Sequence, residues 1–229
     1  MNIQTIQRNF ERRTAADDIF EQLRSEIVSL RLKPGTRISE IEFANQFEVS
    51  RQPVREAFIR LSKINLLEIR PQKATLVRKI SEREILHARF LRVAVEAEVI
   101  RLACNIEGNP FQAGFEENLT AQESALSEGQ VLEFHDLDYD FHNLICATAQ
   151  CEFAYDTIAD SKTHVDRLCL ISLSTERGMY EIFQDHQQLY QVLQKKDAVE
   201  MERLIRLHIC RLDQTLADAR ERHPEYFQD

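Results

Sequence analysis

Glycine, proline and tryptophan are scarce in this chain. Its 229 residues include five glycines, five prolines and no tryptophan, while 43% of them are hydrophobic. So few glycines and prolines argue against collagen-like, linker-rich and turn-dense all-β proteins. The length is sufficient to bury the core of one large domain or of two ordinary ones. We therefore expect a mainly α-helical protein.

Long apolar runs and paired cysteines are also missing. No segment approaches the roughly 20 consecutive apolar residues of a membrane span, and residues 1–10 lack the basic-then-apolar order of a signal peptide. The five cysteines are an odd number and form no C-x-x-C pair, which argues against a disulfide framework or a thiolate zinc site. We expect a cytoplasmic protein with reduced cysteines and no membrane partner.

Charge is distributed unevenly along the chain, although the net charge is -9. Residues 1–80 hold 15 lysines and arginines against 10 aspartates and glutamates, whereas residues 81–229 hold 14 against 28. A basic module on an acidic body can meet phosphates locally while the rest of the molecule stays off the duplex. We expect two domains, 1–80 and 81–229, with their boundary near Ile80.

Three amphipathic segments open the chain and predict three helices. The first begins after Thr14 and ends before the sequence KPG, the second begins at Ser39, and the third begins at Ser50. Residues 66–70 and 75–78 alternate as two short strands around a turn would. Three helices and a hairpin indicate a winged helix-turn-helix.

The third helix has a polar face that suits DNA. Gln52, Arg55 and Ile59 point away from its apolar stripe, and Arg51 lies at the border. In the major groove arginine reads guanine and glutamine reads adenine. From these residues alone, a solvated charged face remains the alternative.

A longer string of residues gives this module a family resemblance. Residues 32–35 read LKPG and residues 49–57 read VSRQPVREA, followed by Leu61. This string closely resembles the DNA-binding domain of the GntR family of bacterial transcription regulators, over about residues 14–80. The resemblance implies that Arg51 and Arg55 reach bases or phosphates and that Ser50 caps its helix and bonds a phosphate. It also implies that the turn at Gln72 and Lys73 is the wing tip. The candidate DNA-binding residues are Arg37, Ser50, Arg51, Gln52, Arg55, Gln72 and Lys73.

Three positions depart from the family pattern. Glu48, Asn65 and Ala74 stand where the family usually has glycine. Asparagine tolerates left-handed backbone, whereas a positive φ would strain Glu48 and Ala74.

From residue 81 onward the long segments all indicate helices. The expected ranges are about 81–106, 111–127, 130–149, 152–171, 175–195 and 197–222. Asp138 and His142 are four residues apart and share a helix face. His142, His186 and His208 each lie about 11–12 residues, or roughly 17 Å, past the expected start of a helix. Three imidazoles at such positions can meet in the core of a bundle.

One carboxylate and three imidazoles suit zinc, nickel or another borderline divalent ion. From spacing alone, half-buried hydrogen-bonded histidines remain the alternative. The sequences around Asp138-x-x-Phe141-His142, Asp185-His186 and His208 are similar to the metal-binding FCD subfamily of GntR regulators, over about residues 81–222. The resemblance implies that the metal ligands are Asp138, His142, His186 and His208.

Two arginines are candidates to bind an anionic effector. Arg92 lies in a segment that resembles the first effector-domain helix of the subfamily, and a guanidinium can grip a carboxylate bidentately. Its alternative is an exposed intrahelical pair with Glu96. Arg167 is a second, weaker candidate.

These residues together favour a homodimeric transcription regulator. Its bundle would bind a divalent metal and a small organic acid, and occupancy would change binding to a palindromic operator in double-stranded DNA. One alternative is a regulator that senses the metal directly. Another is a metal-dependent helical-bundle enzyme, which would need a general base or redox partner beside the metal. No glutamate is placed for that role in the sequence, so we expect no enzyme.

Overall fold

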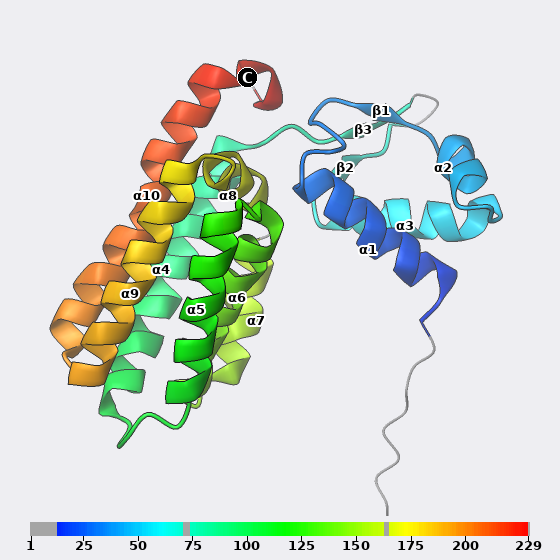
Figure 1. The fold of residues 1–229 in the computed structure, drawn as a ribbon. Coiled ribbons are helices and arrows are strands. Elements are labelled where there is room, and N and C mark those ends of the chain that lie inside the picture. Colours follow the sequence, from blue (N-terminus) through cyan, green and yellow to red (C-terminus); the bar gives the residue numbers. More distant parts are fainter. Residues whose placement is uncertain (1–12, 71–73, 163–164, 229) are drawn as a thin grey trace, which may run out of the picture.

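The computed structural model describes residues 13–70, 74–162 and 165–228. A small amino-terminal part lies beside one end of a larger helical bundle (Figure 1). Across these ranges ten α-helices account for most of the chain. None of the described helices combines the length and the apolar character that crossing a bilayer requires. A winged helix-turn-helix followed by an all-α bundle is therefore confirmed as the fold.

The amino-terminal part contains three helices and a small sheet. Its elements are α1 (Ala15–Val28), β1 (Arg37–Ile38), α2 (Glu40–Gln46), α3 (Arg51–Lys63), β2 (Leu67–Glu68) and β3 (Thr75–Val77). The strands are antiparallel in the order β1-β3-β2. The sequence predicts the hairpin of β2 and β3 but not β1, because two residues are too few to show alternation.

Local sequence signals determine where α1 begins. Thr14 accepts from the backbone of Asp17, and the Asp17 side chain accepts from the backbone of Thr14, so the predicted start is confirmed. The helix ends at Val28, earlier than predicted, since Leu30 leaves helical backbone with a φ of 61°.

Two of the three positions that replace a family glycine do have left-handed backbone. The φ angle is 54° at Glu48 and 59° at Asn65, and the side chain of Asn65 accepts a hydrogen bond from Arg78. Ala74 is not among the described residues with a positive φ, so the expected strain is absent there.

The bundle follows the linker after β3. Its elements are α4 (Glu82–Asn105), α5 (Gln112–Glu128), α6 (Val131–Thr148), α7 (Glu152–Lys162), α8 (Asp166–Leu173), α9 (Glu176–Lys195), α10 (Ala198–Arg222) and a 3-10 helix, η1 (Pro224–Tyr226). The prediction of one helix over 152–171 is wrong, because α7 ends at Lys162 and α8 starts at Asp166. Both helices bury one face, so the apolar pattern continues across the break and periodicity does not show it.

Packing joins the two parts of the molecule. Leu170 of α8 belongs to the same buried cluster as Leu23 and Ile27 of α1. The linker is held by the segment that follows α10: the backbone N–H of Ile80 donates to the carbonyl of Tyr226 over 2.8 Å. The linker and α1 are thus both held against the bundle.

Gly178 lets α9 begin directly against the end of α8. A Cβ atom at this position would lie 2.2 Å from the backbone carbonyl oxygen of Ser172. Because backbone cannot move aside cheaply, we expect Gly178→Ala to lower the free energy of unfolding by about 1–3 kcal/mol. Thermal and denaturant unfolding, followed by circular dichroism, measure this loss.

Gly114→Ala is the matched control. A Cβ at Gly114 would lie 3.1 Å from Cδ2 of Leu144, a side chain that can turn aside. Gly114 is the third residue of α5. Alanine forms helix more readily than glycine, by up to about 1 kcal/mol in a helix interior. The unfolding midpoint of this variant should equal or exceed that of the wild type. Equal losses of unfolding free energy in both variants would contradict a tight contact at Gly178.

Candidate metal centre

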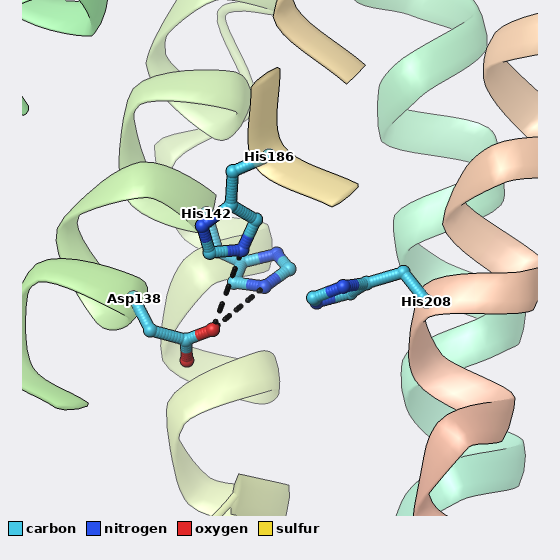
Figure 2. A group of neighbouring side chains, drawn as sticks. All are labelled: Asp138, His142, His186 and His208. Carbon is cyan, nitrogen blue, oxygen red and sulfur yellow. Dashed lines mark ion pairs between the residues drawn. The ribbon is translucent and has the colours of Figure 1, made fainter. Parts of the chain in front are cut away.

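Four side chains from three helices converge inside the bundle (Figure 2). Asp138 and His142 come from α6, His186 from α9 and His208 from α10. One donor atom of each lies within 4.8 Å of the donor atoms of the others. Oδ1 of Asp138 is 3.4 Å from Nε2 of His186 and 3.7 Å from Nε2 of His142. The structure therefore brings together all four residues that the sequence singles out.

Helix starts explain why the three imidazoles meet. Gln130, Thr175 and Asp197 are the N-cap residues of α6, α9 and α10, as predicted. Each histidine consequently lies near the middle of its helix, where packed helices come together whatever their direction. The ring of His186 also stacks on Phe141, with centroids 4.1 Å apart, which fixes its plane.

The second nitrogen of each imidazole faces an acceptor. Nδ1 of His186 is hydrogen-bonded to Oε1 of Gln122 at 2.8 Å, and Nδ1 of His208 to Oδ2 of Asp185 at 3.2 Å. Nδ1 of His142 lies 2.7 Å from Oε2 of Glu96, but without the orientation of a hydrogen bond. An acceptor at Nδ1 keeps the proton there and leaves the Nε2 lone pair available for a ligand. Three such acceptors are the arrangement that imidazole ligands of metals usually have.

Asp138 is neutralised by a buried lysine. Nζ of Lys162, whose side chain is 1% exposed, contacts Oδ2 of Asp138. The same Nζ lies 3.7 Å from the centre of the Tyr139 ring. Asp138 thus holds Lys162 with one oxygen and presents the other to the imidazoles.

The electrostatics of the cluster favour a cation. Burial lowers the pKa of His186 to about 4, and burial also lowers the pKa values of His142 and His208. Burial opposes ionisation of Asp138 as well, but Lys162 and the neighbouring histidines outweigh it and hold the pKa of Asp138 well below its usual value. Neutral imidazoles and an ionised carboxylate are the protonation states that metal ligands need.

The donor set fits a divalent metal ion. Nε2 of His186 is buried and has no hydrogen-bond partner in the described part of the chain, although buried polar atoms are normally paired. Zinc is held by imidazole and carboxylate at about 2.0–2.2 Å, and nickel accepts the same ligands. Donor atoms 3.4–3.7 Å apart are therefore near the separation that ligands of one ion show.

Arg92 lies beside the cluster, within the bundle. Its Nε donates to Oε1 of Glu96 over 2.7 Å, and its Nη2 lies 3.3 Å from Nε2 of His142. The alternative of an intrahelical pair with Glu96 is thus realised, but in buried rather than exposed form. Arg92, Asp138 and His208 line a cavity of about 50 Å³, so Arg92 also remains placed to meet a ligand.

Arg167 of α8 and Arg211 of α10 have different partners. Arg167 is buried, and its Nη1 donates over 2.5 Å to the carbonyl of Arg78 in the linker; it is not among the described residues that line the small cavity. Arg211 lines that cavity and also a wider hollow of about 380 Å³. Its Nε and Nη2 lie 2.5 and 2.8 Å from the carboxylate of Asp185, the acceptor for His208.

Candidate DNA-binding residues of α3 lie on its outer side. Gln52 and Arg55 are exposed, opposite the buried face formed by Val54 and Ala57. Arg51 is exposed too, and its Nη2 lies 3.1 Å from a carboxylate oxygen of Glu40.

The remaining DNA-binding candidates lie around this helix. Arg37 is exposed on β1. Ser50 occupies the N-cap position of α3, but its hydroxyl accepts no capping hydrogen bond from the helix. Gln72 and Lys73, the expected wing tip, lie outside the described residues.

Several partners of the cluster were missed by sequence reasoning. They are Gln122, Lys162, Asp185 and Arg211. Gln122 could have been identified from the sequence, because it is a polar residue on the apolar face of α5. It shares the buried side of this helix with Phe115 and Ala125. Asp185 directly precedes a candidate ligand. No sequence pattern indicated that Lys162 would contact Asp138, because the end of α7 was itself not predicted.

Two family models match the chain. The model described as bacterial regulatory proteins of the gntR family covers residues 15–77, and the model of the FCD domain covers residues 86–211. The first range contains the three helices and the sheet of the amino-terminal part. The second contains all four clustered residues.

Similar proteins agree with these models. The HTH-type transcriptional repressor RspR of Escherichia coli is 35% identical over 213 residues, which cover 92% of each chain. A regulator from Streptomyces ambofaciens is 28% identical over 216 residues, covering 94% of this chain and 90% of the relative. The solved structure of McbR/YncC from E. coli has the same fold, with a TM-score of 0.73, 20% identity, and coverage of 93% of this chain and all of that one. The family and the relatives are transcription regulators rather than enzymes, and this chain belongs to the GntR family as a DNA-binding transcriptional regulator with an FCD effector-binding domain.

Proposed function

We propose that this regulator binds a divalent metal, zinc or nickel, together with a small carboxylate, and that occupancy changes the affinity of a homodimer for a palindromic operator. The DNA-binding part comprises residues 1–80 and the ligand-binding part residues 81–229. The observation that carries the proposal is the buried cluster in which each imidazole has an acceptor at Nδ1. The proposed ligands are Asp138, His142, His186 and His208.

Arg92 is proposed to hold the carboxylate. Its Nη2 now lies against Nε2 of His142, the atom that a metal bond would occupy, so this guanidinium nitrogen would then be free for an anion. The cavity beside Arg92 is small, and it shares lining residues with the wider hollow. A bundle with twice as many acidic as basic residues repels anions, so a metal and a guanidinium are needed to attract one. Arg167 has no such position beside the cavity.

The exposed side of α3 is proposed to enter the major groove. Gln52 and Arg55 would read bases there, with Arg51, Ser50 and Arg37 reaching bases or phosphates alongside. Gln72 and Lys73 complete the proposed contact at the wing tip.

Arg55→Ala should abolish specific operator binding and leave the fold intact. Arg55 is exposed, so the cost falls on base contacts, at about 1–3 kcal/mol for each half-site of the dimer. Gel shifts over a range of salt concentrations, with an operator selected from random duplexes, measure this loss.

Arg101→Ala is the control for charge alone. Arg101 is exposed on α4 and pairs with Glu98, so its removal takes the same charge from the bundle. It should bind the operator as the wild type does. Unchanged footprints and affinity in Arg55→Ala would contradict the proposal that α3 enters the major groove.

His208→Ala should lower metal content and thermal stability together. Ligation across three helices couples the bound ion to the bundle, and an ion present at 100 times its Kd adds about 2.7 kcal/mol to the free energy of unfolding. Elemental analysis and thermal unfolding, each with and without a chelator, measure both effects. The chelator should move the wild type toward the mutant.

His87→Ala is the matched variant for this experiment. His87 is exposed on α4 and lies outside the cluster, so metal content should stay at the wild-type level. Full metal content in His208→Ala would show that the four-ligand set is wrong.

A carboxylate with a neighbouring hydroxyl should bind only to the metal-loaded protein. Four protein ligands leave two adjacent positions on a six-coordinate ion, which such an acid can chelate. Calorimetry with a panel of organic acids, on loaded and stripped protein, tests this dependence. Arg92→Ala should weaken the binding of any acid that the panel identifies. Equal affinity with and without metal, or binding by none of the acids, would favour direct sensing of the metal.

A further inference from the structure

Helix α8 lies between the ligand cavity and the amino-terminal part. Cys169, Ser172 and Leu173 on one side of it line the cavity of about 50 Å³ beside Asp138. Leu170, the residue after Cys169, is buried in the hydrophobic cluster formed mainly by α1, α2 and α3. One helix of eight residues therefore contacts both regions.

A series of contacts runs from the metal cluster to the start of this helix. Oδ2 of Asp138 contacts Nζ of Lys162, and this Nζ lies 3.7 Å from the centre of the Tyr139 ring. The hydroxyl of Tyr139 donates to Oδ1 of Asp166 over 2.7 Å. The side chains of Lys162 and Asp166 are each 1% exposed, so neither can exchange its partners for bulk water without moving.

Asp166 is the point at which this series reaches the DNA-binding part. Nη2 of Arg24, in α1, lies 4.0 Å from Oδ2 of Asp166. Nε2 of His135 lies 3.4 Å from Oδ1 of the same carboxylate. The next residue, Arg167, donates to the carbonyl of Arg78 in the linker. The first two residues of α8 thus touch both α1 and the linker.

We propose that Lys162, Tyr139 and Asp166 couple the metal site to the position of α1. This inference rests on the proposed metal site. A cation at Oδ1 of Asp138 draws negative charge from Oδ2 and weakens its hold on Lys162. Because Lys162 lies against Tyr139, whose hydroxyl binds Asp166, the rearrangement is passed to α8 and to Arg24. Coupling of this kind needs two arrangements that differ in their affinity for the cation.

Tyr139→Phe isolates the coupling. It removes the hydroxyl that binds Asp166 and keeps the ring against Lys162. Zinc affinity is measured by competition with a chromophoric chelator, and operator affinity by fluorescence anisotropy on full-length protein, with zinc and after chelation. In the wild type, zinc should change operator affinity by about 5–150-fold, and in Tyr139→Phe by about twofold or less, with zinc affinity unchanged. Hydrogen exchange in α1, with and without zinc, is a second readout that needs no operator.

Tyr155→Phe is the matched control. Tyr155 lines the same hollow between the two parts as Tyr139 and Asp166, so the variant loses a hydroxyl in the same surroundings. It should keep the wild-type response to zinc. A full response in Tyr139→Phe would overturn the coupling and leave the metal site standing. Zinc binding with no effect on operator affinity or on α1 would do the same, whereas a wild type that binds neither zinc nor nickel would overturn both proposals.

Discussion

The burial of ionisable side chains in the middle of a helical bundle is the constraint on which the rest of the structure depends. A buried carboxylate or imidazole without a partner is costly, and each of these groups has one here. Asp138 is paired with Lys162, and Glu96 is paired with Arg92. Well-packed apolar residues of the same volume are often at least as stabilising as buried ion pairs. The polar centre is therefore better explained by ligand binding than by folding.

Satisfying those partners determines how the helices are arranged around the cluster. The imidazoles of α6, α9 and α10 are held from behind by acceptors on α4, α5 and α9. Side chains on so many helices cannot be moved independently, because each is packed against its neighbours. A ligand that changes one contact in this centre acts on several helices together, which is what a regulated domain requires.

The proposed route from this centre to the DNA-binding part depends on the break between α7 and α8. In one continuous helix, Lys162 and Asp166 would lie one turn apart on the same face. As built, the chain ends one helix beside the cluster and begins the next against α1, where Leu170 joins the core of the amino-terminal part. The amino-terminal part is thus joined to the bundle by packing as well as by the linker, because its hydrophobic core includes a residue of the bundle.

Local interactions are what the sequence by itself determined. The capping box at Thr14, the starts of α6, α9 and α10, and the spacing that places His142, His186 and His208 at mid-helix all depend on residues within a few positions of one another. The tertiary structure alone decided the two-residue strand β1, the break after Lys162, and the partners Gln122, Lys162 and Arg211. These features depend on contacts between segments far apart in the chain, and no periodicity records which segments will meet. For the same reason Arg92 could be identified as a candidate from the sequence, but its burial against both Glu96 and His142 could not.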